Sequence, residues 1–358
     1  MASLKSLAAQ LGLSITTVSR ALAGYTDVAS STRARVAAAA SAVGYRPHPI
    51  ARRLKHGRSE AIGVVLPAEP GHFTDPFFTE LLVGLGEALA RAELDLLVTA
   101  ARPGADEMRV YRRLVEGRRV DGIVLARTRV KDERIGYLLD QDFPFVTHGR
   151  AEERRAYAHV DADGTSAFAA ATRRLIELGH RRIALINAPA SYMFARHREA
   201  GWRQALAQAG LPEGPLRVGE ATEETGYVLV RALLESLERP TAILCATDRL
   251  AVGALGAITA AGARAGRDIS VIGYDDLPIA TYTDPPLTTI AQPIRAMAGR
   301  LTEMLLQRIA GTPAAGLAEI WPAELVLRAS DGPAPIIVSP QQNQGGIHAQ
   351  KKEPRRHL

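Results

Sequence analysis

The chain has 358 residues, too many for one ordinary hydrophobic core, so two or three domains are expected. Its composition, 47% hydrophobic and 23% charged, is typical of soluble globular proteins, and a single cysteine excludes a disulfide framework. The sequence contains no apolar run long enough to span a membrane and does not begin with a secretory signal, so we expect a cytoplasmic protein without a membrane partner.

Positive charge is concentrated at the N-terminal end. Residues 1–60 hold nine Lys or Arg against two Asp or Glu, a net +7, and residues 333–358 carry +3. The total of +6 therefore leaves the middle of the chain at −4. A basic head on a mildly acidic body indicates a protein that binds a polyanion such as DNA. The alternative is an ordinary solvated basic surface.

The basic head predicts three short helices. Ser3 can cap the first helix, whose apolar stripe is Leu4, Leu7, Ala8 and Leu11. After a turn at Gly12, Ser14 can cap a second helix, whose inward positions are Val18, Ala21 and Leu22. Ser31 or Thr32 can begin a third helix, with Val36, Ala40 and Val43 facing inward. Helix, glycine-containing turn and helix is the arrangement that places a second helix in the DNA major groove.

The second helix has side chains that its buried stripe does not need. Ile15, Thr16, Thr17 and Arg20 are free to face outward. Methyl and hydroxyl groups suit thymine methyls and polar base edges, and an arginine one turn later can reach a guanine or a phosphate. A generic three-helix bundle would explain the same helices without DNA.

The segment YRPHPIARRLKHGRS, residues 45–59, predicts a short helix after Pro49. A helix of two turns is marginal alone, so it would form against a partner, and its arginines favour DNA. Leu54 can act as a wedge in a minor-groove base step. A charged linker is the alternative.

These motifs, in this order and spacing, resemble the lactose-repressor/galactose-repressor (LacI/GalR) family of bacterial transcription regulators, from Leu4 to about Ser330. The resemblance implies a dimer on a near-palindromic double-stranded DNA operator, with the hinge helices ordering on its centre. It implies DNA contacts at these positions: Ser14, Ile15, Thr16, Thr17, Ser19, Arg20, Ser31, Arg33, Arg52 and Leu54.

From residue 61 onward, short apolar runs alternate with helical patterns, and the rhythm restarts near residue 183. Such alternation predicts two parallel-sheet lobes with a ligand cleft between them. The expected fold is an all-α helix-turn-helix headpiece with a hinge helix, followed by an α/β core like that of periplasmic binding proteins, made of two doubly wound parallel-sheet lobes. The expected boundaries are a headpiece at 1–46, a hinge at 47–59, a core at 60–332 and a disordered tail at 333–358. Within the core, the N-lobe is about 60–160 plus 291–322, and the C-lobe is about 161–290 plus 323–332.

The same resemblance implies a small sugar effector held between the lobes. The candidate effector-binding residues are Asp75, Phe77, Phe78, His148, Arg150, Arg198, Thr247, Asp248 and Asp275. Carboxylates and arginine can hold sugar hydroxyls while aromatic rings cover the C–H face. Strand-end aspartates that only cap helices, and a Phe-Phe pair that only fills the core, are the alternatives.

One departure concerns the effector. Gly219-Glu220-Ala221 stands where the family often has an aromatic residue, which favours a roomier pocket and members that sense α-glucosides or similar oligosaccharides. No catalytic or metal-binding motif is found, and we expect neither an enzyme nor a cofactor. The tail lacks leucine heptads, which favours a dimer. A periplasmic-type sugar-binding protein with an incidental head is the competing hypothesis.

Overall fold

The computed structural model describes residues 3–45, 58–68, 75–237 and 239–335. The predictions for the hinge helix, including Arg52 and Leu54, and for the tail beyond residue 335 lie outside the described residues.

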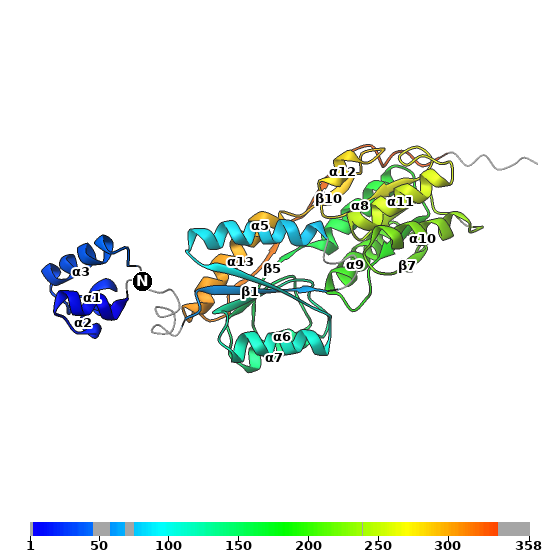
Figure 1. Cartoon of the computed structure of the whole chain (residues 1–358). Helices are drawn as coiled ribbons and strands as arrows, with labels where there is room; N and C mark the ends of the chain where they lie inside the picture. The colour runs from blue at the N-terminus through cyan, green and yellow to red at the C-terminus, as the bar shows by residue number, and fades with distance from the viewer. Residues whose placement is uncertain (1–2, 46–57, 69–74, 238, 336–358) are drawn as a thin grey trace, which may run out of the picture.

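The N-terminal segment forms three helices, α1 (Leu4–Leu11), α2 (Ile15–Leu22) and α3 (Ser30–Ala42) (Figure 1). We call this unit the headpiece. Its small core consists of Leu7, Ala8, Val18, Ala21, Val28, Val36 and Ala40. The helical stripes predicted from the sequence therefore meet in one apolar cluster.

The helix starts follow the predicted caps in two cases out of three. The Ser3 hydroxyl accepts from the Ser6 amide, and the Ser14 hydroxyl accepts from the Thr17 amide, both at 3.0 Å. The third helix departs from the prediction: it begins at Ser30 after Ala29, without a side-chain cap. Val43 is 40% exposed rather than inward, because it lies beyond the last helical turn.

The next unit, which we call lobe 1, is built on a parallel sheet of six strands in the order β11-β5-β4-β3-β1-β2. Its strands are β1 (Ala61–Pro67), β2 (Asp95–Ala101), β3 (Gly122–Leu125), β4 (Phe145–His148), β5 (Ala158–Ala162) and β11 (Ala318–Trp321). Strand β1 is apolar along its length because helices cover both faces of the sheet.

Lobe 1 has two cores, one on each face of this sheet. Helices α5 (Pro76–Arg91) and α13 (Ile294–Ile309) pack over one face, and α6 (Ala105–Glu116) and α7 (Glu133–Asp140) over the other (Figure 1). The chain enters the lobe beside Asp121, whose carboxylate accepts from the Ser59 amide (2.6 Å), the Ser59 hydroxyl (3.0 Å) and the Glu60 amide (2.8 Å).

The second unit, lobe 2, has a parallel sheet in the order β7-β6-β8-β9. The strands are β6 (Ile183–Asn187), β7 (Leu216–Val218), β8 (Ala242–Cys245) and β9 (Ser270–Ile272). Helices α8 (Gly164–Glu177) and α9 (Met193–Gln208) pack closely together, as do α10 (Glu223–Leu234) and α11 (Asp248–Ala260). At Gly201 the α8–α9 contact is so close that a Cβ atom would lie 2.1 Å from the Thr165 carbonyl oxygen.

The chain passes between the lobes three times: after β5, around β10 (Thr289–Ala291), and before β12 (Glu324–Val326). β10 and β12 pair antiparallel in this connecting region, with Ile290 opposite Leu325. A short helix, α12 (Ile279–Tyr282), precedes β10. The two parallel-sheet lobes predicted from the sequence are both present, but the sequence prediction did not identify α7, α12, α13 or β11.

Candidate functional site

Two regions of the molecule carry the residues predicted to bind partners. The first is the outer surface of α2 in the headpiece, and the second is a pocket where the two lobes meet.

On α2, the exposed side chains lie at the N-terminal end. Ile15 is 47% exposed and Thr16 is also exposed, whereas Val18, three residues after Ile15, is fully buried. Thr17 is half-buried, and its hydroxyl lies 2.8 Å from that of Ser14, the helix cap. A single exposed isoleucine is ordinary on a protein surface, but with Thr16 it places methyl and hydroxyl groups at the N-terminal end of α2, where they are available to a partner.

Other headpiece residues have partners within the protein. Arg20 forms an ion pair with Asp27, and its guanidinium carbon lies 5.0 Å from the centre of the Tyr25 ring. Arg33 donates from Nη1 to the carbonyls of Tyr25 (3.1 Å) and Val28 (2.6 Å). Ser19 is half-buried and Ser31 is exposed in the first turn of α3. Arg33 thus holds the loop after α2, a structural role in addition to the DNA contact predicted for it.

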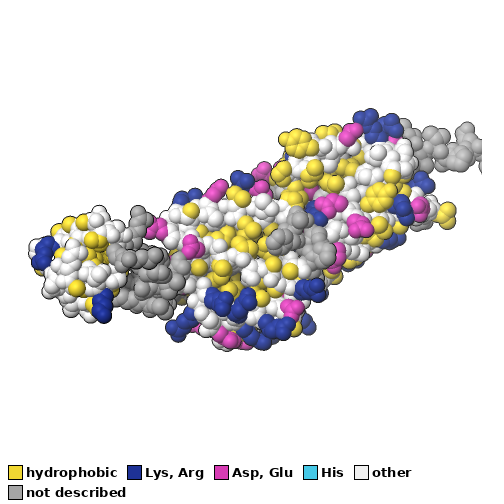
Figure 2. Space-filling view, viewed as in Figure 1, with side chains coloured by type: hydrophobic (Ala, Val, Ile, Leu, Met, Phe, Trp, Pro, Cys, Tyr) yellow, Lys and Arg dark blue, Asp and Glu magenta, His cyan; other side chains and the backbone are white. Residues whose placement is uncertain are grey.

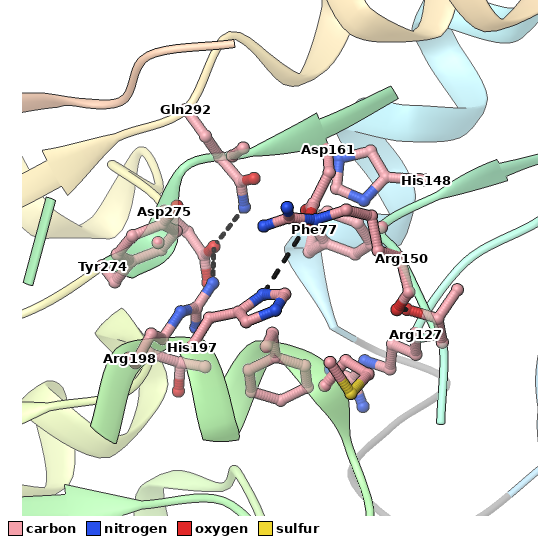
Figure 3. A pocket seen from close by; sticks show the side chains of 17 residues that line it. Phe77, Arg127, His148, Arg150, Asp161, His197, Arg198, Tyr274, Asp275 and Gln292 are labelled. Carbon is pink, nitrogen blue, oxygen red and sulfur yellow. Dashed lines mark hydrogen bonds and ion pairs between the residues drawn. The ribbon is translucent and has the colours of Figure 1, made fainter. Parts of the chain in front are cut away.

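The pocket lies between lobe 1 and lobe 2 (Figure 3). The side chains that line it are Phe77, Arg127, Thr128, His148, Arg150, Asp161, Met193, Phe194, His197, Arg198, Thr247, Tyr274, Asp275 and Gln292.

Arg198 is the central cation of the lobe 2 wall. It projects from α9, with its guanidinium carbon 3.6 Å from the centre of the Tyr274 ring and 4.7 Å from that of Phe194. One Nη atom donates to the Ala246 carbonyl, and the other lies 4.0 Å from the Asp275 carboxylate. Its Nε is buried and has no hydrogen-bond partner among the described residues.

Asp275 lies beside this arginine, shortly after β9, and forms a β-bridge with Ala291 at the end of β10. Gln292 donates to one of its carboxylate oxygens at 2.6 Å (Figure 3). Burial raises the pKa of Asp275 to about 8; Arg198 opposes the shift, and the nearby Asp248 and Asp75 add to it. The backbone of Asp275 has φ 118°, a conformation that side-chain-bearing residues rarely adopt. Such strain is typical of functional sites.

The lobe 1 wall presents an aromatic ring and an imidazole. Phe77, at the start of α5, meets His148 edge to face with 5.1 Å between the ring centres. Burial lowers the pKa of His148 to about 4, so the ring is neutral at pH 7. The Nε2 atom of this imidazole is buried without a partner among the described residues. Two unpaired polar atoms, on His148 and Arg198, therefore line one pocket, an arrangement that a polar ligand would relieve.

A third group of polar residues links the two walls. Arg150 on lobe 1 donates from Nε to Asp161 at 2.7 Å. His197 on α9 approaches the same carboxylate with its Nδ1 at 3.8 Å (Figure 3). These groups can donate to or accept from the hydroxyls of a bound molecule.

Three of the predicted effector contacts do not line the pocket. Asp75 caps α5 through the Phe77 amide (3.0 Å) and pairs with Arg127. Phe78 belongs to the lobe 1 core, with Arg127 over its ring at 5.2 Å. Asp248 accepts from the Leu277 amide (2.8 Å) and from the Thr289 hydroxyl. Each of these departs from the expectation because intramolecular donors already occupy the carboxylates and core packing surrounds the ring.

The structure brings the other six predicted residues together: Phe77, His148, Arg150, Arg198, Thr247 and Asp275. Sequence reasoning missed Asp161, His197, Tyr274 and Gln292. Asp161 lies near the end of β5, and His197 directly precedes Arg198 on α9. Both positions, next to a strand end and next to a predicted ligand, could have pointed to these residues. Among the described residues, we find no helix that could cross a bilayer and no cluster of three metal-ligating side chains.

Comparisons with known proteins agree with this architecture. Residues 3–48 match the family model of bacterial regulatory proteins of the lacI family, and residues 172–330 match a periplasmic binding protein-like domain. The chain is 42% identical to the HTH-type transcriptional regulator AglR of Rhizobium meliloti over 93% of this chain and 95% of that protein. It is 38% identical to RafR of Escherichia coli over 89% of this chain and 95% of that protein.

Solved structures are similar over the same extent. The regulator CelR, in complex with cellobiose, is 30% identical with a TM-score of 0.72, covering 92% of this chain and 100% of that one. The Lac repressor dimer bound to operator is 26% identical with a TM-score of 0.80, covering 92% and 99%. From its headpiece to the end of its second lobe, this chain belongs to the lacI family of bacterial regulatory proteins and is a DNA-binding transcriptional regulator.

Proposed function

We propose that this regulator binds a near-palindromic operator as a homodimer in the cytoplasm and represses transcription there. A neutral disaccharide in the pocket between the lobes changes its affinity for the operator. The observation that carries the sugar assignment is the pairing of Arg198 and Asp275 on one wall with Phe77 and unpaired His148 on the other. A polyol offers donors, acceptors and an apolar ring face to such a pocket.

The arrangement of the polar groups and kinship support two sugar rings rather than one. The polar groups form two sets, Arg198 with Asp275 and Arg150 with Asp161, and each set can serve the hydroxyls of one ring. The similar regulator CelR was solved with a disaccharide, cellobiose. The sequence favours an α-glucoside, because Ala221 stands where an aromatic residue is common. Gly219, Glu220 and Ala221 do not line the pocket, however, so this observation does not discriminate between disaccharides.

Calorimetric titration tests this assignment. The full chain would be titrated with maltose, sucrose, cellobiose, their component monosaccharides and a purine nucleoside. We expect one disaccharide to bind most tightly and Arg198→Ala to abolish that binding. Tight binding of the nucleoside, with none of any sugar, would contradict the proposal. The sugar should be recovered unchanged, because we propose binding without turnover.

A second copy of the chain is the partner that we assign to two exposed apolar surfaces. Leu97 and Val98 are 37% and 42% exposed on β2, an edge strand of the lobe 1 sheet. Ile279 and Tyr282 are 46% and 82% exposed on α12, where Figure 2 shows hydrophobic side chains gathered. An unprotected apolar edge strand is unusual in a monomer. Sedimentation should give a dimer mass, which Tyr282→Asp combined with Val98→Asp should reduce; a monomeric wild-type chain would contradict the assignment.

On the operator, we propose that the hinge segment around Leu54 inserts at the centre of the site, as the resemblance implies. Leu54→Ala should then weaken operator binding more than binding to random DNA. Equal losses on both would count against a wedge. Sugar binding would change the arrangement of the two lobes and so the spacing of the hinges, with a coupling of about 1–3 kcal/mol, the usual range.

A further inference from the structure

We propose that Asp27 determines the specificity of DNA reading, because it positions Arg20 for a guanine and removes the net charge that would bind any phosphate. This inference rests on the proposed function, in which the outer surface of α2 reads the operator. Nothing in the sequence prediction gave Asp27 a role.

The contact between the two side chains uses one edge of the guanidinium. Arg20 donates from Nε to Asp27 Oδ1 at 3.3 Å and from Nη2 to Oδ2. The ring of Tyr25 lies on the guanidinium, 5.0 Å from its carbon to the ring centre. The Nη1 atom has no hydrogen-bond partner within the described part of the headpiece. The arginine is therefore held on one edge and one face, and its other edge remains available.

The loop that carries Asp27 is itself fixed. Arg33 reaches from α3 to the carbonyls of Tyr25 and Val28, which flank Asp27 closely in sequence. Val28 is 8% exposed and belongs to the headpiece core, and the Tyr25 amide donates to the Arg20 carbonyl at 3.1 Å. Asp27 thus faces Arg20 from a loop with three independent attachments, so the ion pair is a property of the folded headpiece.

The free edge of Arg20 matches the chemistry of guanine. A guanidinium has five donors in a planar fork, and two of them can bind O6 and N7 of one guanine together. Asp27 occupies the Nε edge, which leaves the edge formed by Nη1 and the second Nη2 hydrogen. An arginine whose plane is fixed before binding loses less freedom when it forms both bonds.

Charge gives Asp27 a second effect. A free arginine contacts phosphates at any sequence, and each such contact contributes to non-specific binding. Paired with Asp27, Arg20 offers the same free edge to a phosphate as to a guanine, but the neighbouring carboxylate repels the phosphate anion and not the neutral base edge. The ion pair therefore weakens non-specific binding to phosphates more than it weakens binding to the operator, and this difference in affinity is specificity.

The test compares the DNA affinity of Asp27→Asn with that of the wild-type full chain on three kinds of duplex. These are the operator selected by the wild-type chain, a series of operators in which each G·C pair is replaced in turn, and random DNA. Both side chains are about half exposed (41% and 54%), and exposed pairs add little to stability, so the variant should fold. We expect the ratio of operator to random affinity to fall at least fivefold. For random DNA, the slope of the logarithm of the binding constant against the logarithm of the salt concentration should become more negative by roughly 0.9, the value expected for one added phosphate contact.

Two controls separate positioning from other effects. In an Arg20→Ala background, Asp27→Asn should change neither the ratio of operator to random affinity nor the salt slope, because Asp27 is proposed to act on DNA binding only through Arg20. Asp268→Asn makes the same charge change on an exposed pair with Arg267 in lobe 2 and should leave binding unchanged. An unaltered specificity ratio and salt slope in Asp27→Asn, or equal changes with and without Arg20, would overturn the proposal. If the wild-type chain selected no sequence at all, the proposed function would fail first, and this inference with it.

Discussion

Effector affinity should increase with pH, because the proposed sugar ligand needs the ionised form of Asp275. A carboxylate accepts hydrogen bonds from sugar hydroxyls, and the protonated acid has less capacity to accept. Burial raises the pKa of this carboxyl to about 8, so about one-tenth of the free protein is ionised at pH 7 and about nine-tenths at pH 9. Affinity should therefore increase roughly tenfold between these values, about 1.4 kcal/mol.

Other groups in the pocket do not account for such a change. The pKa of His148 lies near 4, so its ring is neutral across this range, and burial lowers the pKa of His197, which favours its neutral form. Binding at pH 7 should release close to one proton as Asp275 ionises, which calorimetry detects as a dependence of the measured heat on the buffer.

The experiment is a calorimetric titration of the disaccharide found by the sugar panel, at pH 6.5, 7, 8 and 9. Asp275→Asn should bind more weakly and show no trend with pH, because its amide does not titrate. A wild-type dissociation constant that stays within twofold over the whole range would refute the reasoning. So would a variant that keeps the wild-type slope.

Three further predictions concern the ionisation of Asp275, the packing at Gly201 and the hydrogen bonds of Asp121. The free wild-type chain should lose stability as the pH increases from 6 to 8, because the folded-state pKa of Asp275 lies above its unfolded value and ionisation then opposes folding; Asp275→Asn should reduce this fall in melting temperature. Gly201→Ala should cost about 1–3 kcal/mol and lower the melting temperature by several degrees, since its Cβ would meet the Thr165 carbonyl, whereas Gly299→Ala, with open space around it, should cost little. Asp121→Ala removes three hydrogen bonds from the segment at Ser59 and should weaken operator binding about tenfold in gel shifts while leaving sugar affinity unchanged; equal loss of both would contradict a role confined to the hinge attachment.

The parts of the fold that the sequence predicted share a strong local signal. Strand β1 is a continuous apolar run, which only a sheet covered on both faces can bury, and α2 combines a clear cap at Ser14 with an inward stripe. Strand β11 was not predicted because Ala318–Trp321 is a short edge strand without a continuous apolar run. Helix α13 lies within residues 291–322, which were assigned to the N-lobe from the sequence without a helix being predicted there.

The pocket was less predictable because its residues come from distant segments. Arg198 and Asp275 could be matched to motifs, but Gln292 reaches Asp275 only through the connection between the lobes. Asp248 was predicted as a sugar ligand, and only the fold shows that its carboxylate accepts from the Leu277 amide and the Thr289 hydroxyl and does not line the pocket. A sequence identifies groups that can bind a hydroxyl, whereas the partners present in the folded state decide which of them are still available.

The central claim, that a sugar held between the lobes controls the reading of DNA by the headpiece, is tested most directly by one binding measurement. The full chain would select duplexes from a random library, and its affinity for the selected site would be measured with and without saturating disaccharide. We predict a near-palindromic site whose affinity changes at least fivefold on addition of the sugar, and no such change for Arg198→Ala. A selected site whose affinity is the same with and without every sugar that binds would contradict the account.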